Sequence, residues 1–220
     1  MNTVLLGLYL IMSVLHLIGS YRDDPVLRRR TKPFLLILLL LFYLVSTSRP
    51  NVLLILALLT SWLGDVLLIP KGHNWFTYGG ISFMFSHLFF VLVYLRQISF
   101  SSVPLALVLV LMVIYYGIAL AVIYALKDTT PKKMVIPMYF YLLCNSTMNI
   151  FAFMQMVSTH SLGPIVAYIG AVLFFISDCT LFLVRYYRRP EIVYKKHFTV
   201  MLTYLLGELL IVIGILMIQG

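Results

Sequence analysis

Charged residues are scarce in this sequence. Only 10% of its 220 residues are Asp, Glu, Lys or Arg, 62% are hydrophobic, and the mean hydropathy is +1.03. A soluble globular domain carries about 25% charged residues, so this composition excludes a water-soluble fold and indicates an integral membrane protein. Eight helical spans of about 20 residues would take about 160 residues and leave only short loops. We therefore expect the function to reside in side chains at membrane depth or just beside it.

Cysteines and acidic residues are also few. The two cysteines, Cys144 and Cys179, lie within apolar runs, which predicts buried thiols and no disulfide framework or cysteine metal site. The 16 basic residues outnumber the 7 acidic ones and give a net charge of +9. In a membrane protein, basic loops that set the topology explain such an excess. We expect no nucleic-acid partner, because the chain has no basic domain to bind one.

Long apolar runs separated by charged or Pro/Gly-containing breaks predict an all-α fold. We expect one integral membrane domain over residues 1–220, a polytopic helical bundle with eight transmembrane helices. The predicted spans are 2–19, 33–48, 51–69, 76–95, 103–126, 134–157, 163–184 and 198–218. No basic residue precedes the first run, so it is predicted to be a true span and not a secretory signal.

The basic residues are distributed unevenly over the predicted loops. All but two of the 16 follow the odd-numbered spans, Lys71 after span three among them, whereas only Arg49 and Arg96 lie on the opposite side. Cytoplasmic loops are enriched in Lys and Arg. The sequence therefore predicts a multi-pass protein of the cell (inner) membrane with both termini outside the cytoplasm.

Three acidic residues, Asp65, Asp178 and Glu208, fall inside predicted spans. A charge at the bilayer centre costs about 2.5–3.5 kcal/mol on insertion scales, so such residues are functional candidates. With a rise of about 1.5 Å per residue, both aspartates lie about 10 Å below the cytoplasmic boundary. Two carboxyl groups at matched depth indicate a functional pair. The alternative is that an aspartate forms an ion pair with Lys32 or with an arginine.

Other polar residues within the spans are His87, Asn145 and Asn149. The two asparagines are four residues apart, so they share a helix face. The functional interpretation competes here with a structural one, since polar side chains in membranes often only join helices by hydrogen bonds. The small residues of span seven predict close helix packing; they are Gly163, Ala167, Gly170 and Ala171.

Five short segments carry a further pattern. They are Thr31-Lys32-Pro33, SWLGDVLL at 61–68, Phe83 followed by SHL at 86–88, GAVLFFISD at 170–178, and Thr203-Tyr204 before LLI at 209–211. In this order, over nearly the whole chain, the set resembles the lysoplasmalogenase family of YhhN-like membrane proteins. Glu208 departs from the pattern, since the family would have a glutamine there.

The resemblance implies hydrolysis of the vinyl-ether bond of lysoplasmalogens, which gives a fatty aldehyde and a glycerophospho-base. Vinyl ethers open by protonation at the β-carbon, and water captures the resulting oxocarbenium ion. Such a reaction needs one protonated and one ionised carboxyl group, as glycosidases do. We accordingly expect Asp65 and Asp178 to be catalytic, with either one as the acid. The expected substrate-binding residues are Lys32, His87, Asn145, Tyr204 and Glu208.

Lys32 has a more specific predicted role. It opens span two at the cytoplasmic boundary, where a flexible stem can carry its ammonium group inward to a lipid phosphate. The alternative is a lysine that only sets topology, like its neighbours Arg28–Arg30. The expected partners are a lysophospholipid substrate and membrane lipids.

Two other functions remain open at this stage. A proton-coupled transporter of lipids or small solutes would also use buried Asp, His and Glu, although the acids cluster towards one side of the membrane. A metal site built from Asp65, His87, Asp178 and Glu208 has suitable ligands, but no local spacing of HxxxH or HxxE type supports it, so we expect no metal and no cofactor. The sequence contains no GxSxG, HExxH, P-loop or dinucleotide fingerprint.

Overall fold

The computed structural model of the protein describes residues 2–70 and 72–219. Within these residues the fold is all-helical, with eight α-helices, two 3-10 turns and no strand. The helices are α1 (Asn2–Tyr21), α2 (Pro25–Ser46), α3 (Val52–Leu67), α4 (His73–Leu95), α5 (Leu105–Leu126), α6 (Lys132–Thr159), α7 (Leu162–Tyr186) and α8 (His197–Gln219). The 3-10 turns are η1 (Phe100–Ser102) and η2 (Pro190–Ile192).

Six of these helices, α1 and α4 to α8, are long and apolar enough to cross a membrane, as in a multi-pass membrane protein. The other two differ from them for visible reasons. Helix α3 is apolar but has only 16 residues. Helix α2 carries Arg28, Arg29, Arg30 and Lys32 in its first half, and only its second half is a continuous apolar run.

Helix α2 begins earlier than the predicted second span, at Pro25 instead of residue 33. Asp24 explains the early start, because its Oδ1 accepts hydrogen bonds from the backbone N–H groups of Val26 (2.9 Å) and Leu27 (3.1 Å). Such a cap satisfies N–H groups that have no partner inside the helix, and proline is favoured at the first helical position. Apolarity marks where a helix can enter lipid, whereas the cap marks where it starts.

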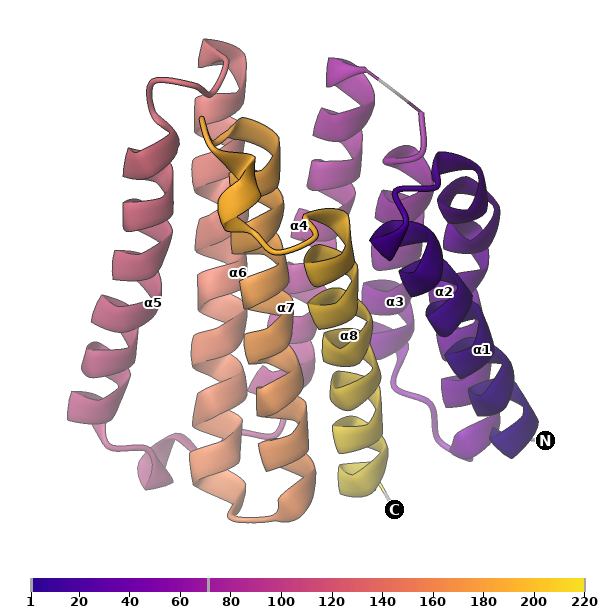
Figure 1. The fold of residues 1–220 in the computed structure, drawn as a ribbon. Helices are drawn as coiled ribbons and strands as arrows, with labels where there is room; N and C mark the ends of the chain where they lie inside the picture. Colours follow the sequence, from indigo (N-terminus) through magenta and orange to yellow (C-terminus); the bar gives the residue numbers. More distant parts are fainter. Residues whose placement is uncertain (1, 71, 220) are drawn as a thin grey trace.

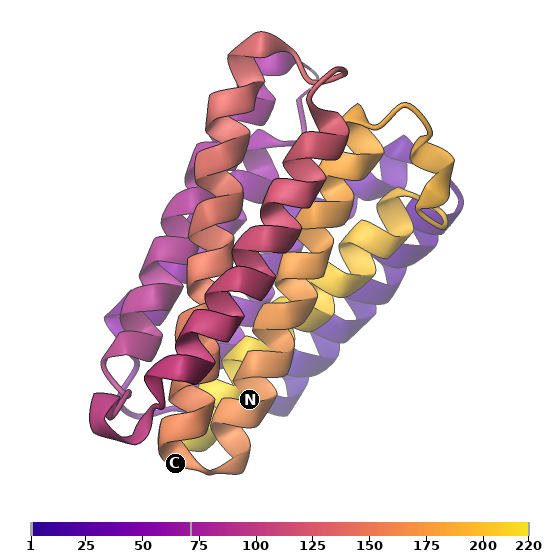
Figure 2. The same ribbon diagram turned by 90° about the vertical axis from the view of Figure 1, so that its left-hand side faces the viewer.

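Seven helices form a closed ring in the order α1, α2, α3, α4, α6, α7 and α8, with α8 packed against α1. Helix α5 lies outside this ring and packs only on α6 and α7 among the described helices, as Figures 1 and 2 show. Polar side chains from α2, α3, α4, α6, α7 and α8 meet inside the ring and are shielded from the surface of the bundle.

Both chain ends lie at one end of the bundle, together with the α2–α3, α4–α5 and α6–α7 connections (Figure 1). The other end holds the remaining connections. There Lys195 lies over the ring of Tyr21, 4.4 Å from its centroid, which joins the α7–α8 segment to the end of α1. The basic residues predicted for one side fall at this second end; Lys71 lies outside the described residues. We call it the basic end.

Helices α7 and α8 touch through their backbones. A Cβ atom added to Gly170 would lie 2.6 Å from the carbonyl oxygen of Gly207, and one added to Gly214 would lie 2.5 Å from the nitrogen of Ala167. Small residues permit this approach. The close-packing stripe predicted for span seven is thereby confirmed, and its partner is a second set of glycines on α8.

Candidate functional site

Asp65, near the end of α3, is one centre of the buried polar residues. Its side chain is 2% exposed. Lys32 Nζ on α2 lies 3.2 Å from Oδ1, and the Tyr204 hydroxyl on α8 donates to Oδ2 at 2.9 Å. The ion pair left open by the sequence as an alternative is therefore present. Both carboxylate oxygens accept hydrogen bonds, one from a cation and one from a neutral phenol.

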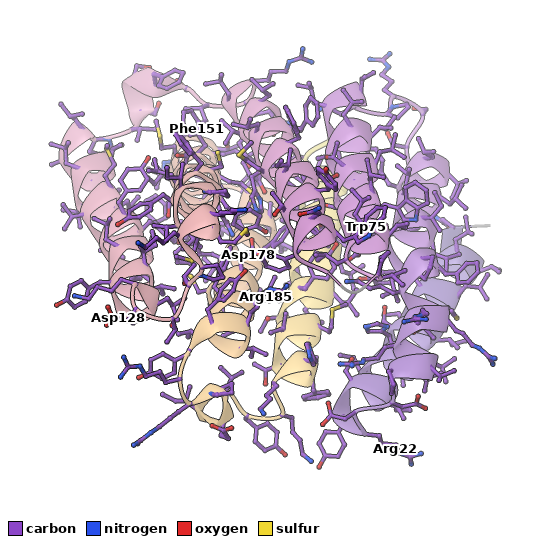
Figure 3. All side chains as sticks on the ribbon, turned by 90° about the horizontal axis from the view of Figure 1, so that it is seen from above. Arg22, Trp75, Asp128, Phe151, Asp178 and Arg185 are labelled. Carbon is purple, nitrogen blue, oxygen red and sulfur yellow. The ribbon has the colours of Figure 1, made fainter. Side chains whose placement is uncertain are left out.

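Asp178, on α7, is the other centre. Its Oδ2 lies 3.1 Å from His87 Nε2 on α4 and accepts a hydrogen bond from Asn145 Nδ2 on α6 at 2.6 Å. His87 and Asn145 are completely buried. In the view along the bundle, Asp178 lies among the helices, whereas Arg22 and Asp128 lie at the periphery (Figure 3).

Asn149 positions the amide of Asn145. Its Nδ2 donates to both the backbone oxygen and Oδ1 of Asn145, each at 3.0 Å. Because Oδ1 of Asn145 is used as an acceptor in this way, the amide presents its NH₂ group to Asp178. The four-residue spacing of the asparagines, read from the sequence as a shared helix face, therefore has a definite role in orienting a donor.

Aromatic rings separate the two aspartate centres. The ring of Phe174 lies 4.9 Å from that of His87 and 5.3 Å from that of Tyr204, centroid to centroid. Phe83 packs against Tyr204 at 5.8 Å. Within the described residues, no hydrogen bond joins Asp65 to Asp178, and each carboxylate has its own donors. The site thus consists of two polar centres bridged by ring contacts.

The glycine of the GD motif has a packing reason. A Cβ atom on Gly64 would lie 2.6 Å from the Phe83 ring. Only a residue without a side chain lets this ring lie directly beside the helix that carries Asp65. Phe83 is then held between Gly64 and Tyr204.

Glu208 forms a third polar group on α8, one helical turn from Tyr204. It is fully buried, and its Oε1 accepts a hydrogen bond from Ser61 at 2.7 Å. Ser61 in turn lies 2.7 Å from the hydroxyl of Ser86. The other oxygen, Oε2, has no hydrogen-bond partner among the described residues. Glu208 therefore joins α8 to α3 and α4, without a hydrogen bond to either aspartate.

The four-ligand metal arrangement is not gathered by the fold. Within residues 2–70 and 72–219, no three His, Cys, Asp or Glu side chains come together as a group that could hold a metal ion. His87 pairs with Asp178, whereas Asp65 and Glu208 have other partners.

Three residues near the polar centres were not singled out from the sequence. Tyr141 lies next to the Asp178 carboxylate and meets the His87 ring edge-on at 5.2 Å. Its position four residues before Asn145, on the same face of α6, is the signal that could have identified it. Ser61 and Ser86 lie inside the recognised segments, but nothing in the sequence pairs them with Glu208.

The fold and site together define a class: a helical membrane bundle with two buried aspartate centres enclosed by a ring of helices. Comparison with known families then identifies the chain. It matches the YhhN family over residues 27–215, a range that contains all five segments described above, and it belongs to that family. Searches of curated proteins and of solved structures gave no significant match.

Proposed function

We propose that this protein is an intramembrane hydrolase that cleaves the vinyl-ether bond of lysoplasmalogen-type lysophospholipids and releases a fatty aldehyde and a glycerophospho-base. One observation carries the proposal: in a chain of the YhhN family, two buried aspartates on α3 and α7 are each held by dedicated hydrogen-bond donors. General acid–base catalysis depends on carboxyl groups held within hydrogen-bond reach of the reacting atoms, and ionisable residues inside a membrane bundle are functional candidates.

The chemistry assigns a different task to each centre. Protonation of the β-carbon converts the vinyl ether into an oxocarbenium ion, water adds to the cationic carbon and loses a proton, and the hemiacetal collapses to aldehyde and glycerol hydroxyl. One water is consumed and no electron is transferred. Asp178 pairs with His87, whose ring nitrogens can either donate or accept. This pair is suited to deliver the proton.

Asp65 is suited to the opposite task. Its carboxylate is compensated by the Lys32 ammonium group, 3.2 Å away. In that form it can orient the attacking water, take up its proton and stabilise the positive charge of the intermediate. Lys32, His87, Asn145, Tyr204 and Glu208 would surround the polar part of the substrate, with Lys32 also available to its phosphate.

We further propose that all eight helices span the membrane, with the basic end in the cytoplasm. The apolar part of α2, from Pro33 onwards, and the 16-residue α3 belong to the same ring as five of the six longer helices. Lys and Arg at the basic end follow the distribution of cytoplasmic loops. Both termini would then lie outside the cytoplasm, and the substrate would come from the cytoplasmic leaflet.

Aldehyde release from a lysoplasmalogen by the purified protein tests the proposal, with the saturated ether lipid as the uncleaved control. Asp65→Asn and Asp178→Asn should each insert normally and lose activity by about a hundredfold or more, a typical acid–base contribution. Asp128→Asn is the matched control, because it makes the same change at an exposed aspartate between α5 and α6. Near-normal turnover in either buried variant would refute the assignment. Proton-coupled lipid uptake without aldehyde release would favour the transporter.

A further inference from the structure

An apolar pocket of about 320 Å³ lies between α4 and α6, closed from behind by α7 and by the end of α3. We call it the α4–α6 pocket; its walls include Gly80, Phe83 and Met84 of α4, Met138 and Tyr141 of α6, and Phe182 of α7. Thr77, also in the wall, donates its hydroxyl to Met134 Sδ at 3.3 Å. The surface offered to a ligand is therefore almost purely hydrocarbon in character.

The pocket opens on the outer surface of the bundle. Ile136, in its wall, is 66% exposed, and Ile81 is 43% exposed. Both residues lie on helices that are long and apolar enough to cross a membrane. If these helices cross the membrane, the opening of the pocket faces lipid, and a ligand would enter it laterally from the bilayer.

The pocket also lies directly beside both aspartate centres. On α4, α6 and α7 a wall residue is four residues from a polar residue: Phe83 from His87, Tyr141 from Asn145, and Phe182 from Asp178. Directly after α3, Leu68 is three residues from Asp65. Four residues correspond to about 6 Å along a helix. In all four pairs the wall residue is the one closer to the basic end.

Two wall residues form the boundary with the polar centres. Phe83 contacts the ring of Tyr204, the donor to Asp65, and Tyr141 contacts the ring of His87, the partner of Asp178. A chain in the pocket would therefore end against both centres at once.

We infer that the α4–α6 pocket binds the hydrocarbon chain of a single-chain phospholipid, which enters between α4 and α6 and presents its ether bond to Asp178 and Asp65. This inference rests on the proposed function and names the binding site of its substrate. If a methylene group takes about the 30 Å³ of a water molecule, the volume of about 320 Å³ holds about ten of them, which fits part of one hydrocarbon chain.

A cation at the basic end of the pocket matches the phosphate of such a lipid. The guanidinium group of Arg185 lies over the ring of Phe76, 3.7 Å from its centroid, and Phe76 is part of the pocket wall. Arg185 is exposed and follows Asp178 by seven residues, about 10 Å along α7. Because the pocket lies on the Arg185 side of the aspartates, the glycerophosphate group would turn back from the ether bond along α7, and together with an extended arginine side chain it can span that separation.

Gly80 provides the sharpest test. A Cβ atom at this position meets no atom of the described residues within 4 Å, so Gly80→Leu would extend into the pocket without disturbing the backbone. Gly117→Leu is the matched control, because a Cβ atom on Gly117 of α5 also meets nothing within 4 Å in the described part of the chain and Gly117 lies outside the pocket. Both full-length variants would be reconstituted in lipid nanodiscs and compared with the unmodified chain.

The probe is a saturated 1-O-hexadecyl lysophosphatidylcholine with a diazirine in its chain, and cross-links are located by mass spectrometry. We expect labelling of α4 and α6 in the unmodified chain and in Gly117→Leu, and a loss of most of this labelling in Gly80→Leu. The KM for a sixteen-carbon lysoplasmalogen should rise about tenfold in Gly80→Leu, as expected from displacing about two buried methylene groups. Met84→Phe fills the same space and serves as a second variant.

Undiminished labelling in the folded filled-pocket variants would overturn the inference. Equal labelling by a diacyl phospholipid carrying the same diazirine would also overturn it, because the pocket would then be a site for bulk lipid. Labelling of the pocket together with no aldehyde release from lysoplasmalogen would uphold the chain-binding site and refute the proposed reaction.

Discussion

Lys32 differs from the other basic residues at its end of the molecule because it points inward. Only 16% of its side chain is exposed, and its ammonium group lies 3.2 Å from Asp65 Oδ1. Arg29 and Arg30, on the same helix, are exposed. The cation is half-buried and the carboxylate is buried, so removing the Lys32 ammonium group would leave the charge of Asp65 uncompensated. Its role as a counter-ion is therefore separable from any role in binding phosphate.

Lys32→Gln should lower kcat by about tenfold or more, because Asp65 loses its compensating charge, a change of at least about 1.4 kcal/mol in the barrier. An additional rise in KM for phosphate-containing substrates, but not for a substrate without phosphate, would show that Lys32 also anchors the head group. Aldehyde release at several substrate concentrations separates the two parameters. Unchanged kinetics with normal expression would remove Lys32 from the site.

Tyr204→Phe should lower kcat by about tenfold, since Asp65 Oδ2 loses a donor worth about 1.5–3 kcal/mol when the acceptor is charged. Tyr9→Phe is the control: Tyr9 is equally buried, but its hydroxyl donates to the backbone oxygen of Leu205 at 2.8 Å. The control should keep its kcat while losing a similar amount of stability. Equal losses of activity in the two variants would mean that Tyr204 acts only through packing.

The acidic residues of the candidate site could be predicted from the sequence better than the side chains that hydrogen-bond to them. Buried Asp65, Asp178 and Glu208 are conspicuous because polarity is costly in an apolar span. Their donors are not, because the rotation of one helix against another leaves no signal in a single sequence. His87 and Asp178 are 91 residues apart, and only the packing of α4 beside α6 and α7 brings them together. Local spacing predicted the Asn145–Asn149 pair because both residues lie on one helix.

Among the elements, the contact between α7 and α8 is the one most sensitive to side-chain size. A Cβ atom on Gly207 would lie 2.9 Å from the carbonyl oxygen of Gly170 and from the nitrogen of Phe174. The sequence predicted the stripe on α7, because small residues recur there at helical spacing. It gave no indication that α8 would be the partner, since the glycines of α8 alone are compatible with several neighbours.

Gly207→Val should destabilise the protein by about 1–3 kcal/mol, the usual cost of forcing extra groups into a packed interface. It should also reduce aldehyde release, because Gly207 lies between Leu206 and Glu208 and three residues from Tyr204. The midpoint of thermal unfolding in detergent measures the first effect. Gly117→Val, at a position where a Cβ atom meets nothing within 4 Å among residues 2–70 and 72–219, should leave that midpoint nearly unchanged. An unfolding midpoint that stays the same in Gly207→Val would contradict the close contact.

For the molecule as a whole, the distribution of charge gives a direct prediction of topology. A reporter fused after Gly220 should be found outside the cytoplasm, and one inserted within residues 186–195 should be found inside, because Lys and Arg accumulate at the basic end. The accessibility of each reporter to a membrane-impermeant thiol-reactive reagent, or to an added protease, would show on which side of the membrane it lies. The reverse result would move the α4–α6 pocket to the outer leaflet.

The overall architecture was largely predictable, and its boundaries were less so. Apolar runs at helical length predict helices, and seven of the eight described helices begin and end within a few residues of the predicted spans. Helix α2 is the exception, since Asp24 and Pro25 start it in a strongly basic segment that hydropathy alone reads as a loop. The order of the helices in the ring, with α5 outside it, could not be predicted from the sequence. It depends on tertiary packing, and the loops do not determine which helices become neighbours.

The backbone contact between α7 and α8 has a mechanical consequence. At the glycines of this contact the backbone of one helix lies directly against the other, and the side chains beside it, such as that of Ile211 next to Gly170, have little free space. A shift of α7 along α8 would bring backbone atoms into collision, so we expect the two helices, with Asp178 and Tyr204, to move together. We expect the movement that admits a large molecule to take place on the opposite face of α7. There α4 and α6 contact α7 through flexible methionine and aromatic side chains.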